Sequence, residues 1–193
     1  MAQTSTTIRS ATAHKATITG TVISFSQTGT EYKINSSNTT TTSLGGFEKF
    51  DLITVTGTTN NNKTFTVKSI ASNGSHLVVE ESTITEAAGA SVSLDYIGFV
   101  TDKHQGDGYY SQVDGVHTVA YHVNSTMTGS IKMQGSLATT PTEDDYFDIS
   151  GTTFTADQST LVDSKNFTGN FVWVRAKCTS MTAGSVTKIL YNH

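Results

Sequence analysis

Residues 130–137 read Ser-Ile-Lys-Met-Gln-Gly-Ser-Leu, and this stretch decides the class of fold. Apolar side chains recur at spacings of two or four residues: Ile131, Met133 and Leu137. The polar side chains set between them are Lys132, Gln134 and Ser136. Because successive side chains of a β-strand point to opposite faces, the pattern predicts a strand with the apolar set facing inward and the polar set outward.

The same period of two recurs along the chain, whereas helical periodicity is almost absent. Residues 91–96 and 117–124 alternate in this way, and residues 170–178 are apolar on both faces, which is typical of a central strand. Strand-like stretches follow one another at roughly 8–12 residues, the spacing of sandwiches and barrels. Gly- and Asn-rich segments at 57–63 and 73–74 supply hairpin turns. The sequence therefore predicts an all-β protein.

The strands fall into two antiparallel modules. Residues 17–97 are expected to form a small N-terminal barrel or sandwich, and residues 98–193 a jelly-roll-like β-sandwich. Residues 1–16 are small, polar and aperiodic. We interpret them as a flexible N-terminal arm that orders against a neighbouring subunit.

Composition excludes several classes of function. The net charge is -4 and the pI about 5.8, so there is no cationic surplus to neutralise phosphates, and no nucleic-acid partner is expected. No run of ~18 apolar residues exists, so no membrane partner is expected either. The first residues lack a charged segment followed by an apolar one, which predicts a protein made in the cytoplasm without export. Cys178 is the single cysteine, in a strand-like context that predicts a buried thiol.

Acidic side chains gather at Glu143, Asp144, Asp145 and Asp148. One interpretation is a divalent-cation site, but the segment lacks the glycine and terminal glutamate of a calcium loop. The favoured interpretation is a solvated acidic first turn, because the spacing from Thr142 to Asp145 suits a single capped turn.

A glycine-punctuated loop holds the best candidate for a small site. His104 lies there with Asp102, Asp107 and Asp114, although such a loop is more often a plain connector. His117 and His122 are five residues apart in one predicted strand, so they point to opposite faces and cannot chelate together.

Motifs of nucleophilic and phosphate chemistry are missing from the sequence. No Gly-x-Ser-x-Gly elbow occurs, and no glycine-rich loop ends in Lys-Ser or Lys-Thr. We therefore predict no enzyme, no catalytic residue, no cofactor and no metal ion. Among the aromatic residues, Trp173 is expected in the core, while Tyr109 and Tyr110 remain candidates for contact with a ligand.

Longer stretches carry a resemblance. In the C-terminal half these are residues 129–149, 166–177 and 185–193, and in the N-terminal half residues 50–70 and 86–94. The first set is similar to the C-terminal β-sandwich of virion structural proteins of tailed bacteriophages, notably those infecting marine cyanobacteria. The second set resembles a small β module of phage tail and capsid accessory proteins.

The resemblance implies a non-enzymatic virion structural protein that assembles in the host cytoplasm. We expect a capsid decoration or cement protein, because the chain lacks the long repetitive shaft of a fibre; a tail, neck or fibre component is the alternative. The implied partners are major capsid or tail proteins and further copies of the chain, with a trimer favoured. A second hypothesis, from a different class of function, is a carbohydrate-binding module for host attachment, in which Tyr109 and Tyr110 would contact a host glycan. A polysaccharide-degrading enzyme is the least favoured alternative.

Overall fold

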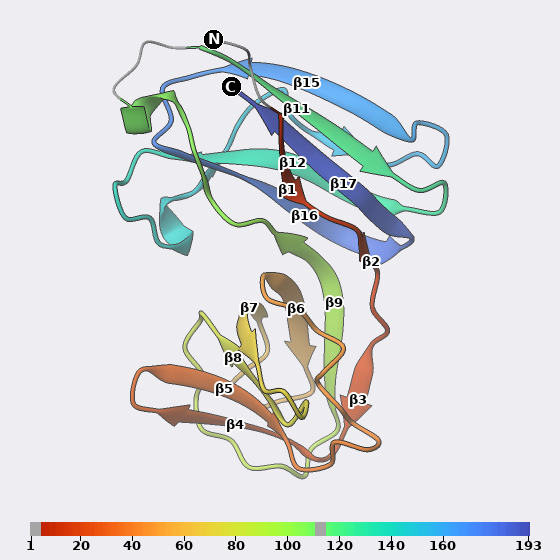
Figure 1. Ribbon diagram of the computed structural model, residues 1–193. Helices are drawn as coiled ribbons and strands as arrows, with labels where there is room; N and C mark the ends of the chain where they lie inside the picture. The colour runs from red at the N-terminus through yellow and green to blue at the C-terminus, as the bar shows by residue number, and fades with distance from the viewer. Residues whose placement is uncertain (1–4, 111–114) are drawn as a thin grey trace. The chain divides into compact units, whose positions relative to one another are not determined.

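A computed structural model describes residues 5–110 and 115–193 (Figure 1). Its regular elements are β-strands and two short 3-10 turns, which confirms the all-β prediction. The chain divides into two compact units, which we call the N-terminal unit (Lys15–Phe99) and the C-terminal unit (Met1–His14 with Val100–His193). The division thus falls at residues 14/15 and 99/100, against the boundaries at 16/17 and 97/98 expected from the sequence.

One antiparallel sheet builds the N-terminal unit, in the order β9-β6-β7-β8-β5-β4, with β3 on the other edge of β9. The strands are β3 (Ile18–Gly20), β4 (Ile23–Thr28), β5 (Glu31–Ser36), β6 (Asp51–Thr56), β7 (Thr64–Ile70), β8 (His76–Val79) and β9 (Val92–Val100). The two end strands, β3 and β4, are separated by only two residues of chain. The sheet must therefore curl until its ends meet, which makes the unit barrel-like.

The core of the N-terminal unit follows the predicted alternation. In β9, Val92, Leu94 and Tyr96 are buried, as expected, and Ser93 and Asp95 between them are more exposed. Strands β4 and β7, which are not neighbours in the sheet, contribute two phenylalanines, Phe25 and Phe65, whose rings stack with centroids 6.4 Å apart. Period-two patterning therefore predicts the buried face correctly here.

Two antiparallel sheets form the C-terminal unit. The first has the order β1-β17-β11-β15, with β2 also on β17; the second centres on β12 and β16, with β13, β14 and β10 at their edges. Tyr121 of β11 joins the two layers: its ring stacks 5.9 Å from that of Phe154, and its hydroxyl donates to the Thr152 carbonyl at 2.8 Å. The arrangement is that of a β-sandwich (Figure 1).

The elements of this unit have the following bounds: β1 (Thr6–Arg9), β2 (Thr12–Ala13), β10 (His104–Gln105), η1 (Asp107–Tyr110), β11 (Val116–Val123), β12 (Thr128–Ser136), η2 (Glu143–Asp145), β13 (Phe147–Asp148), β14 (Phe154–Thr155), β15 (Val162–Thr168), β16 (Trp173–Ala183) and β17 (Ser185–Asn192).

The prediction of a flexible arm is wrong for residues 5–14. Strand β1 pairs with β17 from Thr6↔Tyr191 to Arg9↔Ile189, and β2 pairs with the start of the same strand. Ile8 is buried under this edge. The missed signal is the β-branched run Thr-Thr-Ile at 6–8, which favours a strand.

The alternation predicted for β12 holds for Ile131 and Met133, which are buried, and fails further along. Leu137 lies one residue beyond the end of the strand and is 64% exposed, so it does not face the core. Gln134 and Ser136, expected outward, are both buried. The Gln134 side chain is covered on that face because it hydrogen-bonds to the Arg175 guanidinium at 3.0 Å and to the Asp148 carboxylate at 2.9 Å.

Cys178 lies fully buried in β16, as predicted. Burial raises the pKa of its thiol to about 12, partly opposed by the nearby charge of Arg9. Because the thiolate is the reactive species, we expect negligible reaction with a disulfide reagent such as DTNB at pH 8 in the folded protein. One thiol per chain should react at once in 6 M guanidinium; rapid reaction without denaturant would contradict the buried placement.

Candidate functional site

The candidate site lies at one end of the C-terminal sandwich, around the turn η1. The turn η1 lies where β11 begins and β17 ends, close to the chain end marked C in Figure 1. Glycines make this position possible. The N–H groups of Gly106 and Gly108 donate to the carbonyls of Val172 and Phe171 at 3.1 and 2.9 Å. A Cβ at Gly106 would lie 2.5 Å from the Phe171 oxygen, so the glycine permits the close approach.

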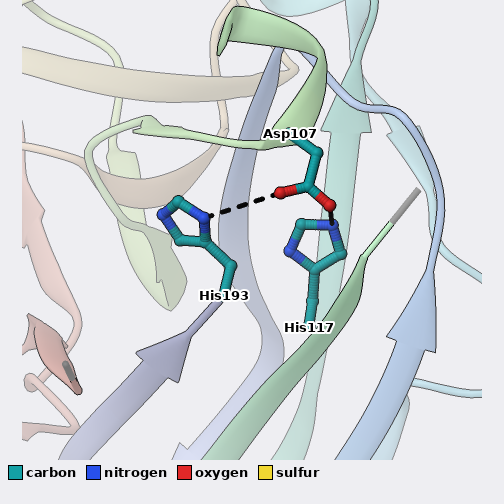
Figure 2. Close-up of side chains that lie close together, drawn as sticks. All are labelled: Asp107, His117 and His193. Atoms are coloured by element: carbon teal, nitrogen blue, oxygen red, sulfur yellow. Dashed lines mark ion pairs between the residues drawn. The ribbon is translucent and has the colours of Figure 1, made fainter. Parts of the chain in front are cut away.

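This packing presents Asp107 to two histidines. The Asp107 carboxylate is buried, and its Oδ2 accepts the Gly115 N–H at 2.6 Å. The same oxygen lies 3.4 Å from Nε2 of His117, and Oδ1 lies 3.8 Å from Nδ1 of His193. Figure 2 shows the carboxylate between the two imidazole rings, each reaching it from a different strand.

His117 is completely buried. Its Nδ1 lies 2.7 Å from the Tyr191 hydroxyl and its Nε2 lies 3.2 Å from the Gly169 carbonyl. Burial, reinforced by the charge of Asp107, raises the pKa of the Tyr191 hydroxyl, which therefore stays protonated. The ring also stacks against Phe167, with centroids 5.0 Å apart. These contacts hold the imidazole in one orientation.

The three residues Asp107, His117 and His193, hereafter the His–Asp cluster, offer ligand atoms that all lie within 4.8 Å of one another. Within residues 5–110 and 115–193, no other group of three His, Cys, Asp or Glu side chains is arranged closely enough to hold a metal ion. Two imidazole nitrogens and one carboxylate oxygen form a set suited to a transition metal or zinc.

The sequence found only one member of the cluster. Of the predicted loop site, Asp107 joins it, whereas Asp102 and His104 do not, and Asp114 lies outside the described residues. The His104 ring instead lies 6.5 Å from Tyr191, and burial lowers the pKa of its imidazole.

His117 and His193 were missed as partners because no local pattern links residues so far apart. The sequence shows only that His117 lies near the start of an alternating strand, in the stretch His117-Thr-Val-Ala-Tyr. The prediction that His117 and His122 do not act together agrees with their unequal burial: His117 is buried and His122 is partly exposed.

Tyr109 and Tyr110 lie on η1 beside the cluster and are 46% and 49% exposed. Their rings meet edge to face at 5.2 Å, and Tyr109 also packs 5.0 Å from Trp173. Trp173, expected in the core, is only partly buried, because it stands at the first position of β16 with Lys103 over its ring. The result is an aromatic group at the surface.

The acidic side chains at 143–148 make structural contacts within the C-terminal unit. The predicted capped turn is confirmed, because the Asp145 carboxylate accepts from the Thr142 N–H at 2.7 Å and from the Thr142 hydroxyl at 2.8 Å, which lowers the pKa of the Asp145 carboxyl. Glu143 binds the buried Arg175 guanidinium through two hydrogen bonds of 2.6 and 2.8 Å. Asp148 pairs with Lys132. These carboxylates therefore point to separate partners and not to a common cation.

Replacing Glu143 by glutamine should destabilise the C-terminal unit by about 1.5–3 kcal/mol, the range for hydrogen bonds to a charged group. The loss arises because the nearly buried Arg175 side chain keeps its charge but loses a bidentate carboxylate. Urea unfolding followed by Trp173 fluorescence measures the change. Asp144→Asn, at the exposed neighbouring position, is the control and should change stability by less than about 0.5 kcal/mol. Equal effects of the two variants would contradict the assignment.

Comparison with protein-family models, with curated proteins and with solved structures found no match to this chain. In the described residues, no helix is long and apolar enough to cross a membrane.

Proposed function

We propose that the chain is a non-enzymatic structural protein of a tailed-bacteriophage virion, a capsid decoration or cement protein that attaches through protein–protein contacts. The proposal starts from the sequence resemblance. A specific feature of the C-terminal unit supports it, namely the distribution of exposed apolar side chains.

Exposed large apolar side chains concentrate on the C-terminal unit. Within the described residues, the N-terminal unit exposes one, Ile84, and the C-terminal unit exposes the following seven: Tyr109, Tyr110, Val116, Leu137, Phe147, Leu161 and Val162. Where such side chains form a contiguous patch, the patch usually marks a contact with a partner. This asymmetry supports the proposal, in which the C-terminal unit attaches to the particle and the N-terminal unit is displayed.

Some of these side chains are neighbours. Leu137 follows Ser136, which pairs with Trp173, and the Trp173 ring contacts Tyr109. Phe147 of β13 pairs with Gly135 of β12, the strand that Leu137 follows, and the Phe147 ring lies 6.0 Å from that of Phe171. An apolar and aromatic surface at one end of a rigid sandwich suits a contact with a capsid or tail protein, since aromatic anchors dominate such interfaces.

Labelling of purified particles tests the proposal. Antibodies against the recombinant chain, used for immunogold labelling with cryo-EM of the same particles, should mark the head at many symmetric positions. Label on the tail, neck or fibre would replace the decoration role by the alternative structural role. Particles that lack the chain, while infected cells contain it, would overturn the virion proposal.

A second experiment tests the attachment surface. Leu137→Asp should abolish binding of the recombinant chain to particles stripped of it, because a carboxylate would enter the apolar contact. Ile84→Asp, at a similarly exposed site on the other unit, is the matched control and should bind normally. Light scattering on the free chain checks the expected trimer.

Glycan binding is the second candidate function, favoured by the half-exposed Tyr109 and Tyr110 rings. Their rings are inclined by 77°, so they would grip a ligand from two sides and would not form a flat platform. A glycan array with the wild-type chain and with Tyr109→Ala and Tyr110→Ala variants decides this: binding that survives both substitutions removes the two tyrosines from any glycan site.

A further inference from the structure

We infer that the His–Asp cluster binds one divalent metal ion of the zinc type. The inference rests on residues of the C-terminal unit alone and is independent of the proposed virion role. It also departs from the prediction from the sequence, which assigned no metal ligand to this chain.

The separations within the cluster match those around a four-coordinate ion. Zinc binds nitrogen and oxygen ligands at about 2.0–2.2 Å, so two ligands at a tetrahedral angle are about 3.4 Å apart. His117 Nε2 and Asp107 Oδ2 are separated by 3.4 Å. His193 Nδ1 lies 3.8 Å from the other carboxylate oxygen, and all three ligand atoms lie within 4.8 Å of one another. His193 is the exposed member of the cluster, and a rotation of its side chain would bring the third ligand into place.

Groups around the ligands already orient them. Metal-bound histidines usually make a hydrogen bond through their other ring nitrogen, and ligating carboxylates are also hydrogen-bonded. Here His117 Nδ1 contacts the Tyr191 hydroxyl at 2.7 Å, and the Gly115 N–H donates to Asp107 at 2.6 Å. The buried Asp107 carboxylate and the buried His117 imidazole are therefore held in place before any ion binds.

Binding requires a change of tautomer at His117. In the metal-free protein Nε2 faces the Gly169 carbonyl, which can only accept, so the ring proton sits on Nε2 and Nδ1 accepts from Tyr191. In the metal complex Nε2 offers its lone pair to the ion and Nδ1 carries the proton, which it donates to the Tyr191 oxygen. The Tyr191 hydroxyl then turns its own hydrogen away from Nδ1.

The donor set selects the metal. Two nitrogens and one oxygen disfavour calcium and magnesium, which prefer oxygen ligands, and favour zinc, nickel or cobalt. Three protein ligands leave one coordination position for water or for a group from a partner. The ion would join η1 and β11 to the residue that follows β17, far away in the sequence, so its expected effect is to stabilise this end of the sandwich.

Calorimetric titration of the full chain with zinc chloride, after removal of any histidine tag and treatment with chelator, tests the inference. We expect one ion per chain and a rise in Tm that chelator reverses. His193→Ala should weaken binding at least about tenfold without loss of fold, because its side chain is partly exposed. Tyr191→Phe should weaken binding by roughly 10–100-fold through the lost hydrogen bond to His117.

His122→Ala is the matched control, a histidine on the same strand but outside the cluster, and it should bind zinc like the wild type. Cobalt should give the intense visible absorption of a tetrahedral complex with the wild-type chain and not with His193→Ala. No binding to the wild-type chain, equal binding to His193→Ala, or equal losses in His193→Ala and His122→Ala would each overturn the inference, and none of them would bear on the virion proposal.

Discussion

Replacing Lys15 by methionine is expected to destabilise the N-terminal unit by about 3–5 kcal/mol, the cost of breaking a buried ion pair from one side. The Lys15 ammonium lies 2.5 Å from Oδ2 of Asp51, whose side chain has no exposed surface. The same oxygen accepts the Glu48 N–H at 2.7 Å. Methionine keeps the apolar stem beside the Tyr96 ring and removes only the charge that compensates the buried carboxylate.

Lys68→Met is the matched control for this prediction. It breaks a Lys68–Glu80 pair of 3.3 Å in the same unit, but both side chains are exposed, so the cost should stay below about 1 kcal/mol. Trp173 lies in the other unit, so its fluorescence does not report on this one. Hydrogen exchange measured by mass spectrometry on peptides from β6 and β7 does. Equal loss of protection in the two variants would show that the buried Lys15–Asp51 pair stabilises the unit no more than the exposed Lys68–Glu80 pair.

Lys15 also shows where prediction from the sequence stops. It belongs to residues 1–16, which composition assigned to a flexible arm, yet the structure ties it to Asp51 and pairs the residues before it with β17. Both contacts join positions far apart in the chain, and a short polar segment carries no local periodicity that reveals them. Alternation predicts which face of a strand is buried, but it cannot name the strand that will cover it.

The candidate site divides in the same way. The glycine-punctuated loop is visible in the sequence, because close backbone approach demands glycine; of its residues, Asp107 lies in the cluster, and Tyr109 and Tyr110 lie beside it. The partners of Asp107 depend on the order of strands in the sheet, which brings the start of β11 beside the end of β17. That order is decided by packing across the whole sandwich, so neither His117 nor His193 could be assigned to the site from its neighbours in sequence.

Ile53→Ala should destabilise the N-terminal unit by about 2–5 kcal/mol, because truncating a buried isoleucine loses apolar burial and leaves a cavity. Ile53 is completely buried in β6, where it pairs with Phe65 on one side and Tyr96 on the other, so the surrounding strands can collapse only partly. The same substitution at Ile84, which is 58% exposed, should change stability by less than about 0.5 kcal/mol. Hydrogen exchange in β6 and β7 compares the two variants on one scale. Similar losses would contradict the placement of Ile53 in the core of the N-terminal unit.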